Sequence, residues 1–282
     1  MTAYFTVHNV LSCNPPGNAL AGMPYEKEVT STCASNLDRT IEQARQAARE
    51  HGKQLVILTM GKIAFMRIMG IDSRSPILKE DYLCYPFWSD TYQCFVLAAD
   101  HPSYLMRGNH HLVPVMQFAA QRAVEIAEHG LELEEHHDYL LDPPAELFKE
   151  WVKGYKLALQ HDPNIALSYD IETPHKQGKS EDEIAPEDAD DYTILRCAFC
   201  YEPGRAVSVR WNAEYMPWIE ELFLSEGTGV GWNSSGYDDA RIMNQLAFKL
   251  KPVDGMIAWH VLNSALPKSL GFVTPFYVKN TA

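Results

Sequence analysis

Basic side chains are scarce in this sequence: 24 Lys and Arg residues stand against 37 Asp and Glu residues, and the formal net charge is −13. Such an acidic chain repels a phosphate backbone at long range, which argues against nonspecific binding to nucleic acid. Carboxylates that bind metal ions also add negative charge, so a metal-dependent enzyme can be acidic. Residues 181–191 (EDEIAPEDADD) contain no base and are predicted to form a solvated loop.

Long apolar runs are also missing. No stretch approaches the roughly 18 apolar residues of a membrane helix, and the first residues, MTAYFTVHNV, lack the basic region and apolar run of a secretory signal. We therefore expect no membrane partner and a cytoplasmic location. The chain has six cysteines, and a cytosolic compartment disfavours disulfides, which leaves metal binding or burial. No Walker loop, GxGxxG motif or Ser-His-Asp pattern is found.

What is present is an apolar fraction of 46%, enough for a packed core, arranged in two blocks of strand and helix patterns. In the first block we predict strands at 4–11, 54–59 and 93–99 and helices at 26–51, 62–69 and 111–128. In the second we predict strands at 165–171, 192–201, 205–211 and 230–232 and helices at 217–226, 238–248 and 255–262. In the first block, strands that alternate with helices indicate a parallel sheet, and in the second the runs 192–201 and 205–211 are expected to pair around a turn at 202–204. Both blocks favour an α/β fold.

Two acidic residues, Asp170 and Glu172, end the predicted strand that begins at Ile165. Side chains alternate along a strand, so these carboxylates point to the same face. At the carboxyl end of a central strand they can offer oxygen ligands to a hard cation such as Mg²⁺. Acids two residues apart are common, however, and a solvent-facing strand edge is the alternative interpretation.

A loop of small residues (GWNSSGY, 231–237) leads into a third acid, Asp238, at the start of a predicted helix. On its own, Asp238 is explained by helix capping and needs no catalytic role.

Together, IALSYDIET (165–173) and GWNSSGYDDARIM (231–243) resemble the first two motifs of DEDD-type 3′→5′ exonucleases, especially the proofreading domains of family A and phage DNA polymerases. VDGMIAWHVL (253–262) and PKSLGF (267–272) resemble the segment after the second motif. The resemblance covers about residues 164–276. It implies an RNase H-like core that hydrolyses DNA from a single-stranded 3′ end with two Mg²⁺ or Mn²⁺ ions.

Site residues follow from this resemblance position by position. Asp170, Glu172 and Asp238 would be the metal ligands and catalytic residues. Asn233 and Tyr237 would lie beside the terminal nucleotide, and Thr173 would contact the same nucleotide.

The third motif of the family, a Tyr or His followed by a fourth metal-binding Asp, is not found. After Phe272 the chain reads VTPFYVKNTA, and Asp254 comes too early. We therefore expect impaired activity.

The first block resembles family 4 uracil-DNA glycosylases in three ordered pieces: NVLSCNPPGN (9–18), QLVILTMGKIAFMRIMG (54–70) and ADHPSYLMR (99–107). The resemblance implies that Asn9 reads a flipped base and that Leu105 lies in a loop that enters the DNA. It implies that His101 stabilises the charge that develops on uracil. A lone histidine is more often structural, and only the Pro-Ser that follows His101 favours catalysis.

Cys13 and Cys33 match two of the four cysteines that hold an iron–sulfur cluster in that family. The other two ligands and the first catalytic loop would lie upstream, so we expect no stable cluster and no uracil excision. Cys197 and Cys200 form a CxxC, but on a strand they fall on opposite faces, and we expect core residues rather than metal ligands.

We thus predict three parts: an N-terminally incomplete glycosylase-like domain with a parallel sheet at 1–129, a helical linker at 130–163, and a C-terminally incomplete RNase H-like exonuclease domain at 164–282. This order suggests a fragment of a phage-type replication protein, in the host cytoplasm, with a polymerase domain downstream. The alternatives are a noncatalytic DNA-binding or interaction module and a DEDD ribonuclease.

Overall fold

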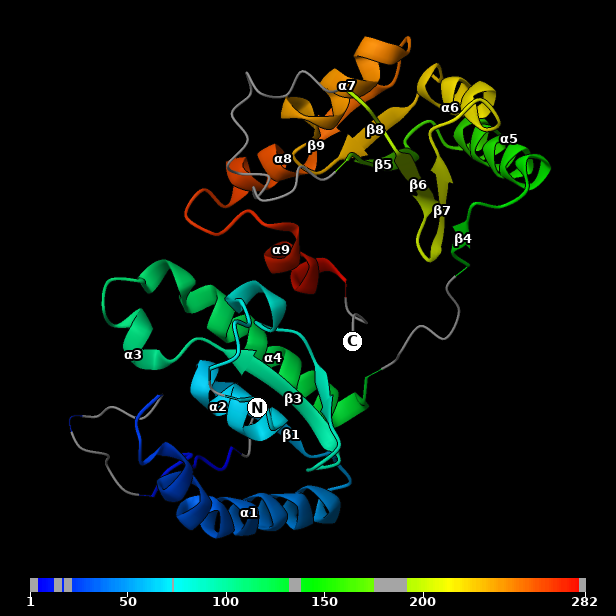
Figure 1. Cartoon of the computed structure of the whole chain (residues 1–282). Helices are drawn as coiled ribbons and strands as arrows, with labels where there is room; N and C mark the ends of the chain where they lie inside the picture. Colours follow the sequence, from blue (N-terminus) through cyan, green and yellow to red (C-terminus); the bar gives the residue numbers. More distant parts are fainter. Residues whose placement is uncertain are drawn as a thin grey trace. The chain divides into compact units, whose positions relative to one another are not determined.

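The computed structural model describes residues 5–12, 17, 22–72, 74–131, 138–174 and 192–278 (Figure 1). The chain divides into two compact units. Unit 1 comprises Met1–Glu134 and Ala265–Ala282, and unit 2 comprises Glu135–Ser264. No helix in the described part of the chain has the length and apolar character needed to cross a membrane.

Unit 1 is built on a three-stranded sheet in the order β1-β3-β2. β1 (Val56–Met60) and β3 (Cys94–Ala99) run parallel, whereas β2 (Phe87–Ser89) is antiparallel to β3. The predicted parallel sheet is therefore confirmed for one pair and wrong for the other. The reason is the short turn at 90–93, because only antiparallel strands can be joined by so short a connection.

Helices cover both faces of this sheet. The principal ones are α1 (Glu26–Glu50), α2 (Lys62–Met69) and α4 (Val113–His129). Because side chains alternate along β3, Val96 and Ala98 pack into a cluster with α1 and α2, while Leu97 packs with α4 on the other face. The three helices begin and end within a few residues of their predicted limits.

The predicted strand at 4–11 is wrong over its described residues. Residues 5–12 form no strand, and Phe5 and Val7 are 55% and 89% exposed. An apolar run becomes a strand only where a neighbouring strand satisfies its backbone hydrogen bonds. The composition of the run does not show whether another strand lies beside it.

The carboxyl-terminal helix α9 (Leu270–Tyr277) belongs to unit 1. The Arg122 side chain of α4 donates a 2.8 Å hydrogen bond to the carbonyl oxygen of Pro275, and the Tyr85 hydroxyl donates one of 2.7 Å to that of Gly271. The sequence predicts one domain over 164–282, whereas the residues from Ala265 onward belong to unit 1 in the structure.

Unit 2 contains a six-stranded sheet in the order β4-β7-β6-β5-β8-β9. Its strands are β4 (Leu140–Leu141), β5 (Ala166–Glu172), β6 (Arg196–Glu202), β7 (Arg205–Arg210), β8 (Thr228–Gly231) and β9 (Lys251–Asp254). β6 is antiparallel to both of its neighbours, and all other neighbouring pairs run parallel. The sheet of unit 2 is thus mixed, which agrees with the expected α/β class, and β6 and β7 form the strand pair predicted around residues 202–204.

The core of unit 2 lies between this sheet and its helices. These are α5 (Ala145–His161), α6 (Met216–Phe223), α7 (Asp238–Gln245) and α8 (Gly255–Leu262). Phe148 and Tyr155 of α5 are fully buried in one cluster with Leu167 of β5. The stretch 130–163, predicted as a linker, therefore supplies part of the core of unit 2.

Candidate functional site

β5 separates an apolar face from an acidic one. Tyr169 and Ile171 are buried in the core of unit 2, whereas Asp170 and Glu172 are exposed on the opposite face. The strand continues to Glu172, one residue beyond its predicted end. The prediction that these two carboxylates share a face is confirmed, because the alternation of the strand decides it.

Asp238 reaches β5 from the loop that follows β8. β8 runs parallel to β5, and α7 begins at Asp238, so the third acid arrives near the carboxyl end of β5. Burial raises the pKa of Asp238 to about 7, and the charges of Asp170 and Asp239 add to this effect. A hydrogen bond with the backbone of Ile171 acts in the opposite direction. Asp238 and Asp170 are thus close enough to repel each other as carboxylates.

Asp239, which the sequence did not single out, has a different environment from Asp238. Its carboxylate accepts a 2.5 Å hydrogen bond from the Tyr169 hydroxyl in the core. Burial raises the pKa of Tyr169, and this hydrogen bond raises it further, so the phenol remains a donor. The buried Tyr169–Asp239 pair thereby anchors the start of α7 to β5. The alternation along β5, which turns Tyr169 inward, was the only sequence signal of this role.

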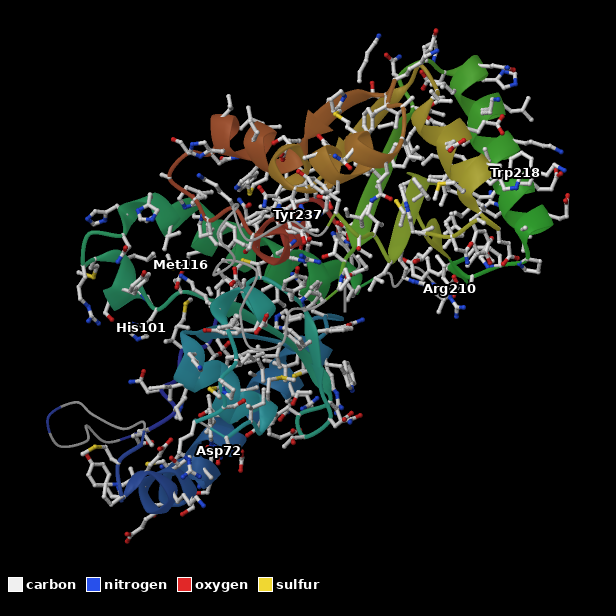
Figure 2. The ribbon with its side chains drawn as sticks, turned by 45° about the horizontal axis from the view of Figure 1, so that its top comes forward. Asp72, His101, Met116, Arg210, Trp218 and Tyr237 are labelled. Carbon is white, nitrogen blue, oxygen red and sulfur yellow. The ribbon has the colours of Figure 1, made fainter. Side chains whose placement is uncertain are left out.

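Two residues predicted to contact the same nucleotide meet directly. The hydroxyl groups of Thr173 and Tyr237 lie 2.8 Å apart. The guanidinium of Arg241 lies 3.4 Å from the centre of the Tyr237 ring, and its Nη1 donates to the Tyr237 carbonyl oxygen at 3.3 Å. Figure 2 labels Tyr237 among the side chains of the molecule. Contacts from two elements thus hold the Tyr237 side chain in place.

The loop that carries these residues is held by Asp254. Its carboxylate accepts hydrogen bonds from the backbone N–H groups of Asn233 (3.0 Å) and Ser235 (3.2 Å) and from the Ser235 hydroxyl (2.8 Å). It also caps α8 by accepting from the N–H groups of Met256 and Ile257. Burial would raise the pKa of Asp254, but these hydrogen bonds outweigh it and lower the pKa.

Backbone geometry in this loop demands particular residues. Asn233 has a φ of 58°, a left-handed conformation that asparagine tolerates better than most residues. A Cβ atom on Gly231 would overlap Ser234, so the end of β8 needs glycine for this turn. The small-residue loop seen in the sequence is therefore required by close packing.

The donor set fits a hard cation in its chemistry. Asp170, Glu172 and Asp238 offer only carboxylate oxygens, the ligands that Mg²⁺ and Mn²⁺ prefer. A bound cation would offset the cost of a buried negative charge at Asp238 and its repulsion by Asp170, the effects that raise the pKa of Asp238. Within the described residues, no group of three His, Cys, Asp or Glu side chains is arranged to hold a metal ion as it stands.

In unit 1, His101 lies where two parallel strands end. Gly61 follows β1, and a Cβ atom added to it would lie 3.1 Å from the Cβ of His101, which follows β3. His101 caps the short helix α3 (Pro102–Leu105): its Nδ1 accepts a hydrogen bond from the Ser103 N–H and lies 2.7 Å from the Ser103 hydroxyl. This local role explains the His-Pro-Ser pattern without catalysis. Figure 2 labels His101.

The structure places the other predicted residues of unit 1 less favourably. Leu105 is only 4% exposed, because it faces the core, so its side chain is not presented for entry into DNA. Its neighbours Tyr104 and Met106 are 43% and 78% exposed. Asn9 is exposed in the segment that forms no strand.

The cysteines do not assemble a cluster site in the described residues. Cys33 is buried on α1, and Cys13 lies outside the described residues. Burial raises the pKa of Cys84 to about 12 and that of Cys94 to about 11, so both remain protonated thiols. On β6, Cys197 is buried and Cys200 is partly exposed, as expected from opposite faces.

Comparison with protein-family models and with curated proteins finds no match to this chain.

Proposed function

We propose that unit 2 is a metal-dependent 3′→5′ exonuclease of the DEDD type that acts on single-stranded DNA. The observation that carries this proposal is the approach of Asp238 to Asp170 at the carboxyl end of β5. Such a site suits hydrolysis of a phosphodiester, because grouped carboxylates can hold the cations that this reaction needs.

The sheet of unit 2 supports the same proposal. The strands β7-β6-β5-β8-β9 are ordered so that the first strand in the sequence, β5, is central and only the second, β6, is reversed. This is the topology expected of an RNase H-like core, and it puts Asp170 and Glu172 on the central strand. In α/β sheets, sites lie outside the carboxyl ends of such strands.

Each part of the site would have a distinct task. Asp170, Glu172 and Asp238 would hold the cations, which when bound activate water and stabilise the leaving oxygen. The Tyr169–Asp239 pair orients the start of α7 and with it Asp238. Asn233, Tyr237 and Thr173 form the surface against which the terminal nucleotide would bind.

The test is hydrolysis of a 5′-labelled single-stranded DNA by the purified chain with Mn²⁺, with Mg²⁺ and with a chelator. We expect weak stepwise shortening from the 3′ end that Mn²⁺ favours. Asp170→Ala should lower the rate by about 100-fold, as removal of a key electrostatic group typically does. Glu146→Gln, which changes an exposed carboxylate of α5, is the matched control and should leave the rate unchanged.

Three other results would each contradict the proposed DNA exonuclease activity of this site. Equal rates in wild type and Asp170→Ala would show that another site or a contaminant cleaves the DNA. Absence of cleavage in all variants would favour a noncatalytic DNA-binding module. Faster cleavage of RNA than of DNA would favour a DEDD ribonuclease.

For unit 1 we propose a glycosylase-like fold without uracil excision and without a stable iron–sulfur cluster. His101 at the ends of β1 and β3 supports the likeness, whereas the burial of Leu105 argues against DNA insertion by that residue. Release of free uracil from uracil-containing DNA, or a visible absorption band from a cluster, would refute this proposal.

A further inference from the structure

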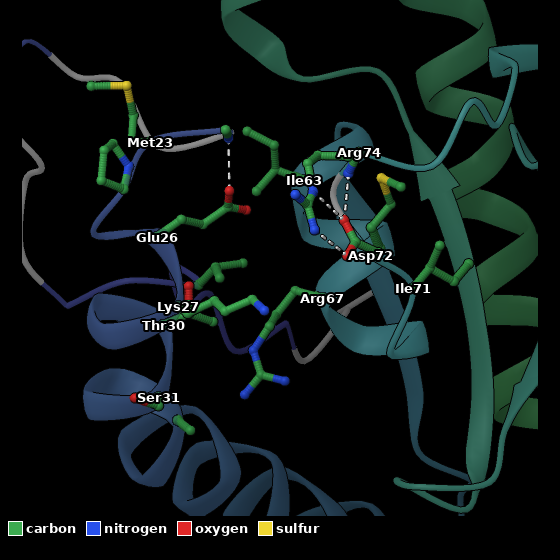
Figure 3. Close-up of a pocket in the computed structure, with 15 residues that line it drawn as sticks. Met23, Glu26, Lys27, Thr30, Ser31, Ile63, Arg67, Ile71, Asp72 and Arg74 are labelled. Atoms are coloured by element: carbon green, nitrogen blue, oxygen red, sulfur yellow. Dashed lines mark hydrogen bonds and ion pairs between the residues drawn. The ribbon is translucent and has the colours of Figure 1, made fainter.

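Unit 1 contains a cavity of about 680 Å³ between α1 and α2 (Figure 3). This volume lies within the range of about 300–1,000 Å³ that is typical of small-molecule sites. Lys27 and Thr30 line the side of α1, and Ile63 and Arg67 line that of α2. None of the catalytic, metal-binding or nucleotide-contacting residues predicted from the sequence lines this cavity.

Both acids of the cavity are occupied by hydrogen bonds. Asp72 accepts from the backbone N–H of Arg74 at 2.9 Å and from its guanidinium at 3.1 Å. These hydrogen bonds lower the pKa of Asp72 to about 2, and the charges of Arg74 and Lys27 add to the effect. Glu26 accepts from the backbone N–H of Gly22 at 2.7 Å.

Two cationic side chains that line the cavity, those of Lys27 and Arg67, have no hydrogen-bond partner among the described residues. Figure 3 shows that the side chains of Lys27 and Arg67 enter the same space from opposite helices. Among the residues that the structure describes, neither forms a hydrogen bond or an ion pair, and the Nε of Arg67 is buried with no acceptor. Because a buried donor without an acceptor is unfavourable, this arrangement favours an anionic ligand.

The two cations and the apolar residues of the cavity together indicate the class of anion. A phosphate monoester carries nearly two negative charges at neutral pH, which matches one Lys and one Arg better than a single carboxylate does. The Arg fork suits two phosphate oxygens, and Lys adds a point charge. Ile63, Met66 and Ile71 form an apolar wall that can contact a flat, uncharged group.

We propose that this cavity binds a phosphate monoester of nucleotide size, with the phosphate between Lys27 and Arg67 and the base against Ile63 and Ile71. The site belongs to unit 1 and does not depend on the proposed exonuclease.

The test is calorimetric titration of the full chain, in chelator, with deoxyadenosine 5′-monophosphate, deoxyadenosine and inorganic phosphate. We expect the monophosphate to bind at least ten times more tightly than either of the other two. Arg67→Gln should weaken its binding at least ten-fold. Arg49→Gln, which changes an exposed arginine at the far end of α1, should not. Asp170→Ala should also bind normally, which separates this cavity from product binding in unit 2.

Lys27→Gln provides a second variant, because Lys27 is exposed and its replacement does not threaten folding. It should weaken monophosphate binding several-fold without a change in melting temperature. Equal binding of nucleoside and monophosphate would overturn the proposal. So would equal affinities of wild type, Lys27→Gln and Arg67→Gln, or no binding of the monophosphate at millimolar concentration.

Discussion

The hydroxyl groups of Thr173 and Tyr237 lie 2.8 Å apart, although one residue follows β5 and the other precedes α7. This hydrogen bond joins the two segments that carry the candidate metal ligands. It therefore links the position of Asp238 to that of Asp170 and Glu172, and it locates the expected contact with the terminal nucleotide.

A double-mutant cycle can measure this bond. Thr173→Val and Tyr237→Phe should each raise the KM for single-stranded DNA several-fold, because a hydrogen bond of this kind contributes about 1 kcal/mol. The double mutant should be little worse than either single mutant, with a coupling energy of about 1 kcal/mol. Strictly additive effects would mean that the two hydroxyl groups act independently. The ring contact with Arg241 is kept in Tyr237→Phe, so the fold of the loop is controlled for.

Asp254 should be a positioning residue of the loop between β8 and α7. Asp254→Ala removes the acceptor for Asn233 and Ser235 and the cap of α8. The free energy of unfolding should fall by about 2 kcal/mol, the upper range for loss of a helix cap. DNA hydrolysis should fall with it, because the loop delivers Asp238. Urea unfolding and measurement of the DNA hydrolysis rate test this prediction, with Glu146→Gln as control. If Asp254→Ala changes neither the free energy of unfolding nor the rate, the loop does not need Asp254.

The raised pKa of Asp238 predicts a pH-dependent stability in metal-free protein. The folded state holds this proton up to about pH 7, whereas the ordinary pKa is 3.8. The stabilisation is therefore fully present below about pH 4 and is lost as the pH rises through about 7. Asp238→Asn should remove this component, so its stability relative to wild type should rise over that range. Urea unfolding in chelator between about pH 4 and pH 8 measures it, and a constant difference between the two proteins would contradict the prediction.

Because α5 is part of the core of unit 2, its buried residues should contribute far more to the free energy of unfolding than its exposed ones. Phe148→Ala should lower the free energy of unfolding by about 3–5 kcal/mol, because Phe148 is fully buried. Leu157→Ala on the same helix should have little effect, because Leu157 is 57% exposed. Urea unfolding followed by tryptophan fluorescence compares them. If both substitutions lowered the free energy of unfolding by the same small amount, α5 would be a linker and not part of the core.

Local pattern predicted much of this protein correctly. The runs that became β1, β3 and β5 alternate or are apolar throughout, and α2 and α8 span the predicted residues. The failure at residues 5–11 has a simple cause, since an apolar run without a partner strand stays unpaired. Likewise, the apolar stripe of α5 did not reveal which sheet would bury it.

The sequence by itself determined that Asp170 and Glu172 share a face, because the period of a strand is two, and that small residues form the loop before Asp238. The close approach of Ser234 to Gly231 explains why this loop needs a small residue there. Only the tertiary structure decided that Asp238 lies near enough to Asp170 for its charge to raise the Asp238 pKa, while Asp239 turns inward to Tyr169. It also decided that the last helix, α9, packs with unit 1 and that Lys27 and Arg67 face one cavity. These outcomes depend on contacts between residues far apart in the chain, which no local period or propensity encodes.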